Sequence, residues 1–154
     1  SSNTGIYGPV FEFMIHEGLP GKEEYKDSEK YEVKNWNWSH SNKLTHIITK
    51  INTIRKQQTS LQQTNNVVFC QTDNDQIMAY YKYSDDKWNE TLMICNMDPQ
   101  NSKHGYVRLP IEQIGNNPVR VVDQITGNSY WWDKEWNFVE LHPHLPFHLF
   151  KLEW

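Results

Sequence analysis

Short apolar segments alternate with clusters of turn residues from residue 65 to the end of the chain. The segments are rich in β-branched and aromatic side chains, whereas the breaks between them contain Asp, Asn, Gly and Pro, as in 98–101 and 115–118. Strands that recur about every 8–12 residues with short turns are typical of an antiparallel sandwich or barrel. The predicted strands are Val67–Gln71, Gln76–Tyr83, Thr91–Met97, Gly105–Leu109, Val119–Gln124, Ser129–Trp132, Asn137–Leu141 and Phe147–Leu152.

Two of these segments carry a prediction about burial. Leu92–Cys95 is apolar at every position, so both of its faces need cover and we expect it in the centre of a sheet. Tyr80–Tyr83 combines three phenol rings with Lys82, which predicts a half-exposed strand.

A helical pattern runs from Ser41 to about Gln58, before the first strand. Ser39 or Ser41 can serve as the N-cap, and the cationic residues of the last turn suit the helix dipole. The change from helical to strand spacing puts the best boundary in the chain at about residue 62. The helix should dock a single apolar stripe on a larger body, and this stripe consists of Leu44, Ile47, Ile48, Ile51 and Ile54.

Composition excludes several classes of protein. The 154 residues include 7 Trp, 8 Tyr and 6 Phe, enough to form a core, so disorder is not expected. A net charge of −4 argues against nucleic acid as a partner, and no run of about 18 apolar residues predicts a membrane span. Cys70 and Cys95 lie in apolar runs, so we expect buried free thiols in a cytoplasmic protein without a signal peptide.

The first 43 residues contain a short apolar segment followed by a long polar one. Gly5–Phe13 is typical of a strand, but a lone strand cannot satisfy its own backbone groups, which suggests a piece of a longer protein. Residues 16–43 show no sustained period and are rich in Gly, Pro, Glu, Lys, Asp, Asn and Ser. Such a stretch is either a functional loop or a solvated loop whose tyrosines pack locally.

The residue chemistry predicts no complete active site. The sequence contains no Gly-rich phosphate loop and no GxSxG or CxxC motif. The carboxylates of Glu23, Glu24, Asp27 and Glu29 all lie on one polar loop, where nothing would desolvate one and leave another ionised. We therefore assign no catalytic residue.

Two weaker patterns stay open as alternatives. His142 and His144 should point the same way because prolines hold this segment extended, but no nearby carboxylate or thiolate completes a set with His148, and no metal site is expected. A second pattern is a sugar-stacking platform, although a hairpin that closes its own core is the more frequent reason for such a group. The platform would consist of Tyr130, Trp131 and Trp136.

Several strings along the chain resemble, in order, the C-terminal part of the alpha-1,4-glucan:maltose-1-phosphate maltosyltransferases, members of the α-amylase superfamily of glycoside hydrolases. The string PGKEEYKDSEKYE at 20–32 is much more specific than any general amylase feature. The other strings are Gly5-Ile6-Tyr7, Ile51-Asn52-x-Ile54-Arg55, Thr72-Asp73-Asn74-Asp75, Asn96-Met97-Asp98-Pro99, Asp123-x-x-Thr126-Gly127 and Asn137-Phe138-Val139-x-Leu141.

The resemblance implies an architecture for the whole chain. Residues 1–62 would be the last strand, loop and helix of a (β/α)8 barrel, and 63–154 would be the C-terminal antiparallel β-sandwich that amylase relatives carry. Residues 14–40 would be the loop at the C-terminal face of the barrel, where such enzymes build their sites.

The resemblance also implies an activity, namely retaining transfer of maltosyl from maltose-1-phosphate to an α-1,4-glucan in glucan biosynthesis. In the family, the Lys-Tyr pair of the DSEKY motif holds the donor phosphate, and here this pair is Lys30 and Tyr31. The family's catalytic carboxylates lie on earlier barrel strands with no counterpart here, so the fragment alone should be inactive. No cofactor is implied, and the parent enzyme is expected to form a homodimer.

Three alternatives remain at this point. The chain could be the C-terminal region of another hydrolase of the α-amylase superfamily, which would have no phosphate chemistry. It could also be a carbohydrate-binding module that uses the aromatic platform. For the site itself, the alternative is that Lys30 pairs with Glu29 or Glu32 on a solvated loop, where an exposed ion pair contributes under about 1 kcal/mol.

Overall fold

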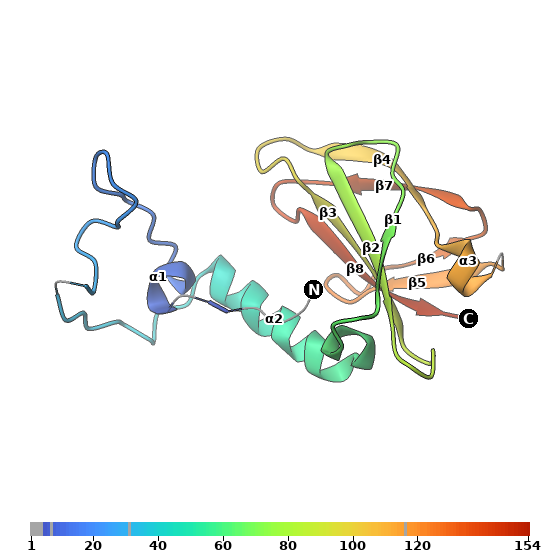
Figure 1. Ribbon diagram of the computed structural model, residues 1–154, viewed down its shortest axis with the longest axis horizontal. Coiled ribbons are helices and arrows are strands. Elements are labelled where there is room, and N and C mark those ends of the chain that lie inside the picture. The colour runs from blue at the N-terminus through green and yellow to red at the C-terminus, as the bar shows by residue number, and fades with distance from the viewer. Residues whose placement is uncertain (1–4, 7, 31, 116) are drawn as a thin grey trace. The chain divides into compact units, whose positions relative to one another are not determined.

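The computed structural model describes residues 5–6, 8–30, 32–115 and 117–154. The chain divides into two compact units, Asn3–Thr53 and Ile54–Trp154, which we call the N-terminal unit and the sheet domain. Figure 1 shows the elements in chain order by colour. No helix within the described residues has the length and apolar character needed to cross a membrane.

The sheet domain is an antiparallel sandwich of two sheets, as predicted. A six-stranded sheet has the order β1-β2-β3-β8-β5-β6, and a two-stranded sheet pairs β4 with β7 (Figure 1). All of these pairings are antiparallel, and each predicted strand is present with its ends shifted by at most two residues. The strands are β1 (Val67–Cys70), β2 (Ile77–Tyr83), β3 (Glu90–Asn96), β4 (Lys103–Arg108), β5 (Val119–Asp123), β6 (Ser129–Trp132), β7 (Trp136–Leu141) and β8 (Phe147–Glu153).

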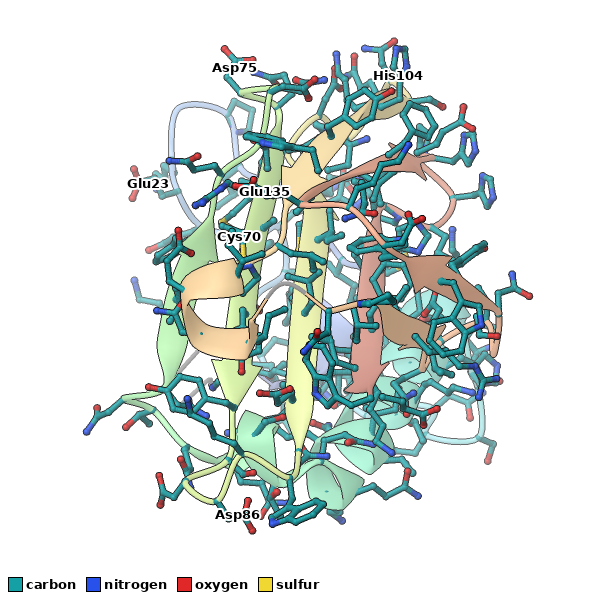
Figure 2. The ribbon with its side chains drawn as sticks, turned by 90° about the vertical axis from the view of Figure 1, so that its right-hand side faces the viewer. Glu23, Cys70, Asp75, Asp86, His104 and Glu135 are labelled. Carbon is teal, nitrogen blue, oxygen red and sulfur yellow. The ribbon has the colours of Figure 1, made fainter. Side chains whose placement is uncertain are left out.

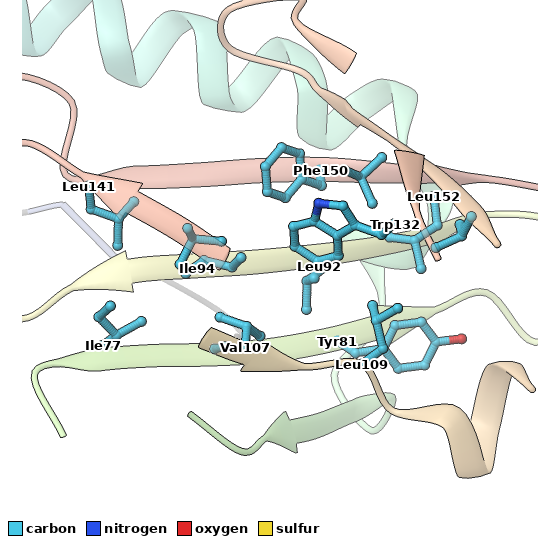
Figure 3. Close-up of a cluster of buried hydrophobic side chains, with 14 residues drawn as sticks. Ile77, Tyr81, Leu92, Ile94, Val107, Leu109, Trp132, Leu141, Phe150 and Leu152 are labelled. Carbon is cyan, nitrogen blue, oxygen red and sulfur yellow. The ribbon is translucent and has the colours of Figure 1, made fainter. Parts of the chain in front are cut away.

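Both sheets contribute to one apolar core, shown in Figure 3. Leu92 and Ile94 of β3 are fully buried, and β3 lies between β2 and β8, so the prediction of a central strand is confirmed. The small sheet contributes Val107 and Leu141 from its inner face. Burial of such side chains, at about 1.5–3 kcal/mol each, is the main force that holds the two sheets together.

The predicted half-exposure of Tyr80–Tyr83 is wrong for its two middle residues. Tyr81 is 0% exposed and Lys82 is 1% exposed. Both polar ends have partners, because the Tyr81 hydroxyl donates to the Glu90 carboxylate and Lys82 Nζ donates to the Gln63 carbonyl oxygen at 2.7 Å. A buried polar group is tolerated when it is hydrogen-bonded, and the sequence pattern does not show those partners.

The predicted helix is confirmed as α2 (Lys43–Gln57), but its N-cap is neither Ser39 nor Ser41. Asn42 Oδ1 accepts from the backbone N–H of Leu44 at 2.9 Å and of Thr45 at 3.0 Å, and Thr45 Oγ1 accepts from Asn42 N in return at 2.9 Å. This reciprocal pair satisfies the first donors of the helix. Of the apolar stripe, Ile54 is buried and the other members are half-buried.

A polar network fixes the end of this helix and the next turn, η1 (Thr59–Gln62), to the large sheet. Ser60 Oγ lies 3.0 Å from Thr91 Oγ1, and Asn89 Oδ1 accepts from the Ser60 backbone N–H at 2.9 Å. Asn89 Nδ2 also donates to Gln58 Oε1 at 2.6 Å. The only other helix of the sheet domain, within its described residues, is the single turn α3 (Ile111–Ile114).

The strand predicted within Gly5–Phe13 is wrong in the described residues of this segment. Gly8–Glu12 instead form a short helix, α1, which ends with Phe13 N donating to the Pro9 carbonyl at 2.8 Å. Pro9 sits in the first turn, where its fixed φ and missing N–H suit a helix. A helical turn also satisfies backbone groups locally, whereas a strand here would need a partner strand.

Candidate functional site

The polar loop of the N-terminal unit is built on a tight turn at Leu19–Lys22. Lys22 N donates to the Leu19 carbonyl at 3.1 Å, and Gly21 has φ +71°, as the third residue of a type II turn requires. The flanking chain pairs through an antiparallel bridge between Gly18 and Tyr25. Pro20-Gly21 therefore closes a short hairpin that carries the charged string after it.

Aromatic side chains stabilise the other end of the loop. The rings of Phe13 and Trp36 stack with centroids 5.5 Å apart, and Trp38 meets Phe13 edge-on at 5.6 Å. Trp36 Nε1 donates to Glu29 Oε1 at 2.8 Å, which fixes one carboxylate of the DSEKY motif. Asn42 Nδ2 donates to the Glu12 carbonyl at 2.8 Å and so connects the start of α2 to the end of α1.

A hollow of about 240 Å³ lies between the hairpin and this aromatic cluster. Its lining combines carboxylates, two ammonium groups and the Trp36 ring. Lys26 donates to Glu17 Oε1 at 3.1 Å, and this hydrogen bond and charge raise the pKa of Lys26. The lining residues are Val10, Ile15, Glu17, Tyr25, Lys26, Asp27, Ser28, Glu29, Lys34 and Trp36.

Lys30, the first predicted site residue, lies in the same loop but does not line this hollow. Its Nζ atom is 2.6 Å from Glu24 Oε1, and its side chain is 59% exposed. Glu29 and Glu32, named above as alternative partners of Lys30, accept hydrogen bonds from other residues. Glu29 accepts from Trp36 Nε1, and Glu32 accepts from Lys34 Nζ at 3.1 Å. Tyr31, the second predicted site residue, lies outside the described residues.

The structure adds polar residues that sequence reasoning did not single out. Lys26 and Lys34 line the hollow, and Trp36 both stacks in its wall and holds Glu29. Lys26 shares the charged string with Lys30, and that was the available signal, whereas Lys34 and Trp36 follow the string within residues 16–43. Which lysine of the loop faces the hollow depends on backbone turns such as the one at Asp27, which has φ +55°.

The alternative aromatic platform is not formed as predicted. Tyr130 and Trp131 are neighbours in β6, so their side chains point to opposite faces of the sheet. The Tyr130 ring meets Phe150 edge-on at 6.3 Å, which places it beside the core residue Phe150. Trp136 belongs to β7 in the other sheet. The three rings therefore do not share one surface.

The histidines near the end of the chain are also separated. His142 and His144 stack with centroids 5.3 Å apart, so they point the same way as predicted. His148 is directed elsewhere, with Nδ1 2.9 Å from Asp123 Oδ2 and Nε2 3.1 Å from the Glu140 carbonyl. These contacts explain the polar role of His148 without a metal ion.

The cysteines are free, as predicted, but they are half-buried where the sequence predicted burial. Burial raises the pKa of Cys70 to about 11 and also raises that of Cys95. Both thiols therefore stay protonated at neutral pH, and neither has the lowered pKa of an activated nucleophile.

Comparisons with known proteins confirm the resemblance seen in the sequence strings. A family model described as "GLGE, C-terminal" matches residues 69–152. The alpha-1,4-glucan:maltose-1-phosphate maltosyltransferase of Methylacidiphilum infernorum is 43% identical over 99% of this chain and 23% of the relative. The enzyme of that name from Chlorobaculum tepidum is 40% identical over 99% of this chain and 24% of the relative. The chain thus spans about a quarter of the length of these relatives.

Solved structures support the fold. An Anoxybacillus alpha-amylase superposes with a TM-score of 0.56 at 13% identity, covering 75% of this chain and 24% of the amylase. AmyP in complex with maltotriose gives a TM-score of 0.56 at 14% identity, over 71% of this chain and 20% of AmyP. At such identities the likeness concerns architecture alone, and it agrees with the predicted β-sandwich of amylase type.

Proposed function

Because the chain belongs to the GLGE C-terminal family, we propose that it is the C-terminal part of a maltosyltransferase that extends an α-1,4-glucan from maltose-1-phosphate. The observation that carries this proposal is the similarity to enzymes of that name over 99% of the chain, the charged loop included. A match confined to the sheet domain would equally suit a hydrolase of the amylase superfamily.

The proposed division of labour follows the resemblance. Residues 1–62 complete the barrel of the parent enzyme and bring the loop at 14–40 to its active-site face. Residues 63–154 support that barrel as a β-sandwich. The carboxylates that form and break the glycosidic bond belong to other parts of the parent enzyme, so this chain supplies binding groups and structural support.

Lys30 and Tyr31 are the proposed contacts to the donor phosphate. Lys30 is suited to this role because its side chain is 59% exposed and lies on a loop rather than in the core. An ammonium group offers mobile positive charge to a phosphate, and a phenol offers an O–H donor. Glu24, 2.6 Å from Lys30 Nζ, would hold the lysine in place until the phosphate competes for it.

Steady-state kinetics of the full-length parent enzyme test this assignment. A hydrogen bond to a charged group contributes about 1.5–3 kcal/mol, so Lys30→Ala should lower kcat/KM for maltose-1-phosphate about 10- to 100-fold. Part of the loss should fall on kcat, because the departing phosphate gains charge in the transition state. Tyr31→Phe should cost less, since it removes one neutral donor.

Lys22→Ala is the matched control, because Lys22 is an exposed lysine in the turn of the same loop. It should leave both kinetic constants within about twofold of the parent values. Equal effects of the two substitutions would show a general effect of loop charge instead of a phosphate contact. Unchanged kinetics for Lys30→Ala would refute the assignment.

A further inference from the structure

The small sheet presents an aromatic outer surface that the proposed phosphate site does not use. Alternate residues of β4 and β7 point into the core, which leaves the intervening residues outside. Tyr106 is 47% exposed, Phe138 is 54% exposed and Trp136 is 38% exposed. The outward residues, which we call the β4–β7 face, are His104, Tyr106, Arg108, Trp136, Phe138 and Glu140.

The rings of this face are organised by strand register. Tyr106 lies directly opposite Phe138, and their rings meet with centroids 5.7 Å apart and an interplanar angle of 70°. The His104 ring lies 6.0 Å from the Phe138 ring. Single exposed aromatic residues are ordinary, but three adjoining rings on one small sheet form a contiguous surface.

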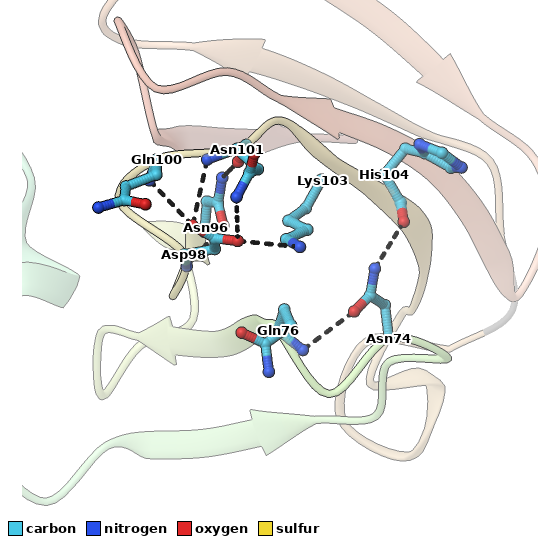
Figure 4. A network of polar contacts seen from close by, with 8 residues as sticks. All are labelled: Asn74, Gln76, Asn96, Asp98, Gln100, Asn101, Lys103 and His104. Atoms are coloured by element: carbon cyan, nitrogen blue, oxygen red, sulfur yellow. Dashed lines mark hydrogen bonds and ion pairs between the residues drawn. The ribbon is translucent and has the colours of Figure 1, made fainter.

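A turn beside β4 adds polar groups to this surface. Asp73 Oδ1 accepts from the Tyr106 backbone N–H at 2.6 Å, and Asn74 Nδ2 donates to the His104 carbonyl at 2.9 Å. Figure 4 shows Asn74 between His104 and Gln76. Asn74 Oδ1 accepts a hydrogen bond from the Gln76 backbone N–H at 3.0 Å. The position of the turn is therefore fixed by hydrogen bonds to the strand.

Gly105 lets this turn lie directly on β4. A Cβ atom at residue 105 would be 2.6 Å from Asp73 Oδ1 and 3.1 Å from Asn74 Cβ. Any other residue would displace the Asp73 carboxylate from the Tyr106 N–H. The glycine thus allows carboxylates and aromatic rings to line one cavity.

The resulting cavity has a volume of about 550 Å³ and is open to solvent. In Figure 2, Asp75 and His104 lie at the same end of the sheet domain, and Asp86 lies at the opposite end. The size is in the range of ligand sites, which combine apolar walls with a few polar groups. The lining residues are Asp73, Asn74, Asp75, His104, Gly105, Tyr106 and Phe138.

We propose that this cavity binds a neutral pyranose oligosaccharide. Aromatic faces pack against the C–H faces of pyranose rings, while carboxylate and amide groups bond their hydroxyls. Asp73 and Asp75 give the cavity an acidic rim, which disfavours phosphate esters and nucleic acid. The rings of Tyr106 and Phe138, inclined at 70° to each other, suit a curved chain better than a flat one. The choice of an α-1,4-glucan as that curved chain rests on the proposed function.

Calorimetric titration of the 154-residue chain with maltoheptaose, and with the flat-chained cellohexaose, tests the proposal. Maltoheptaose should bind at least about tenfold more tightly than cellohexaose. Tyr106→Ala and Phe138→Ala should each weaken maltoheptaose binding about tenfold or more, because each removes a large stacking surface. Trp131→Ala is the control, since Trp131 is 68% exposed on β6 of the other sheet, and it should bind as the parent chain does.

Thermal unfolding followed by circular dichroism checks that each variant is folded. Because the substituted residues are about half-exposed or more, each substitution should change the midpoint temperature of unfolding little. Amide shifts of the unaltered chain on adding maltoheptaose should cluster at 73–75 and 104–106. Equal binding of both sugars would overturn the glucan assignment, and absence of binding at 10 mM sugar, or dimerisation through this face, would overturn the site. If the cavity binds maltoheptaose but the parent enzyme is inactive on maltose-1-phosphate, the binding site stands and the proposed function is refuted.

Discussion

The two units of the chain are held together in different ways. The sheet domain buries apolar side chains from both of its sheets, including Leu92 and Phe150 of the large sheet and Val107 of the small one. Among the described residues of the N-terminal unit, Val10 is the only buried apolar side chain. This unit relies instead on turns, aromatic stacking and exposed ion pairs, such as Lys26–Glu17 with side chains 52% and 73% exposed. Because exposed pairs contribute about 0–1 kcal/mol, the sheet domain carries the stability.

The comparison also separates stability from the proposed chemistry. The loop with Lys30 belongs to the weakly held unit, and binding loops commonly depend on a rigid scaffold supplied by other segments. The sheet domain, in contrast, has the core needed to fold on its own. Three of the four predictions below compare the two units and one concerns the sheet domain alone, from the largest expected effect to the smallest, with the hydrogen-exchange measurement last.

Core truncation should give the largest difference between the units. Leu92→Ala should lower the free energy of unfolding by about 2–5 kcal/mol, because it opens a cavity in a packed core. Val10→Ala should change the same quantity by less than about 1 kcal/mol, since no other apolar side chain among the described residues of its unit is buried with it. Urea denaturation followed by fluorescence measures both, and similar costs for the two variants would contradict the comparison.

Glycine substitutions should show the same contrast on a smaller scale. Gly105→Ala should lower the free energy of unfolding by about 1–3 kcal/mol, because the added Cβ would contact the Asp73 side chain in the packed sheet domain. Gly21→Ala strains a residue with φ +71°, by about 1–2 kcal/mol locally. That strain should leave global unfolding unchanged, because the hairpin lies outside the cooperative core. If Gly21→Ala lowered the free energy of global unfolding more than Gly105→Ala does, the hairpin would belong to the cooperative core.

Acid should destabilise the sheet domain through Asp123. Burial acts to raise the pKa of this carboxyl, but hydrogen bonds from His148 and the Ile125 N–H outweigh it, and the pKa is lowered. A lowered pKa stabilises the folded state above the unfolded value of about 3.9, and that contribution is lost as pH falls through the folded value. Urea denaturation at a series of pH values between 6 and 2.5 should show the free energy of unfolding falling as this contribution is lost. Asp123→Asn should remove that part of the pH dependence, and an unchanged pH profile would exclude Asp123 as its source.

The strands could be predicted from the sequence because alternation and turn residues are local signals. Burial of Lys82 could not, since it depends on a carbonyl at Gln63 that is distant in the sequence. The predicted N-caps, Ser39 and Ser41, lie three residues and one residue before Asn42, because Asn and Ser have similar capping propensity and only the reciprocal bond with Thr45 decides between them.

The candidate sites show the same limit. Lys30 was found through a resemblance, whereas the β4–β7 face needs the register that places Tyr106 opposite Phe138, 32 positions later in the sequence. Gly105 gave no signal in the sequence either, because its role depends on a turn from another part of the chain. Pairing between distant strands is not contained in any local pattern.

Amide hydrogen exchange of the intact 154-residue chain tests most directly whether stability resides in the sheet domain. The amides of Leu92–Cys95 should exchange only through global unfolding, with protection of at least about a thousandfold. The Phe13 and Ile15 amides, which donate to the Pro9 and Val10 carbonyls at 2.8 and 2.9 Å, should exchange through local opening with little protection. Equal protection of the two groups in a dilute monomer would contradict the account.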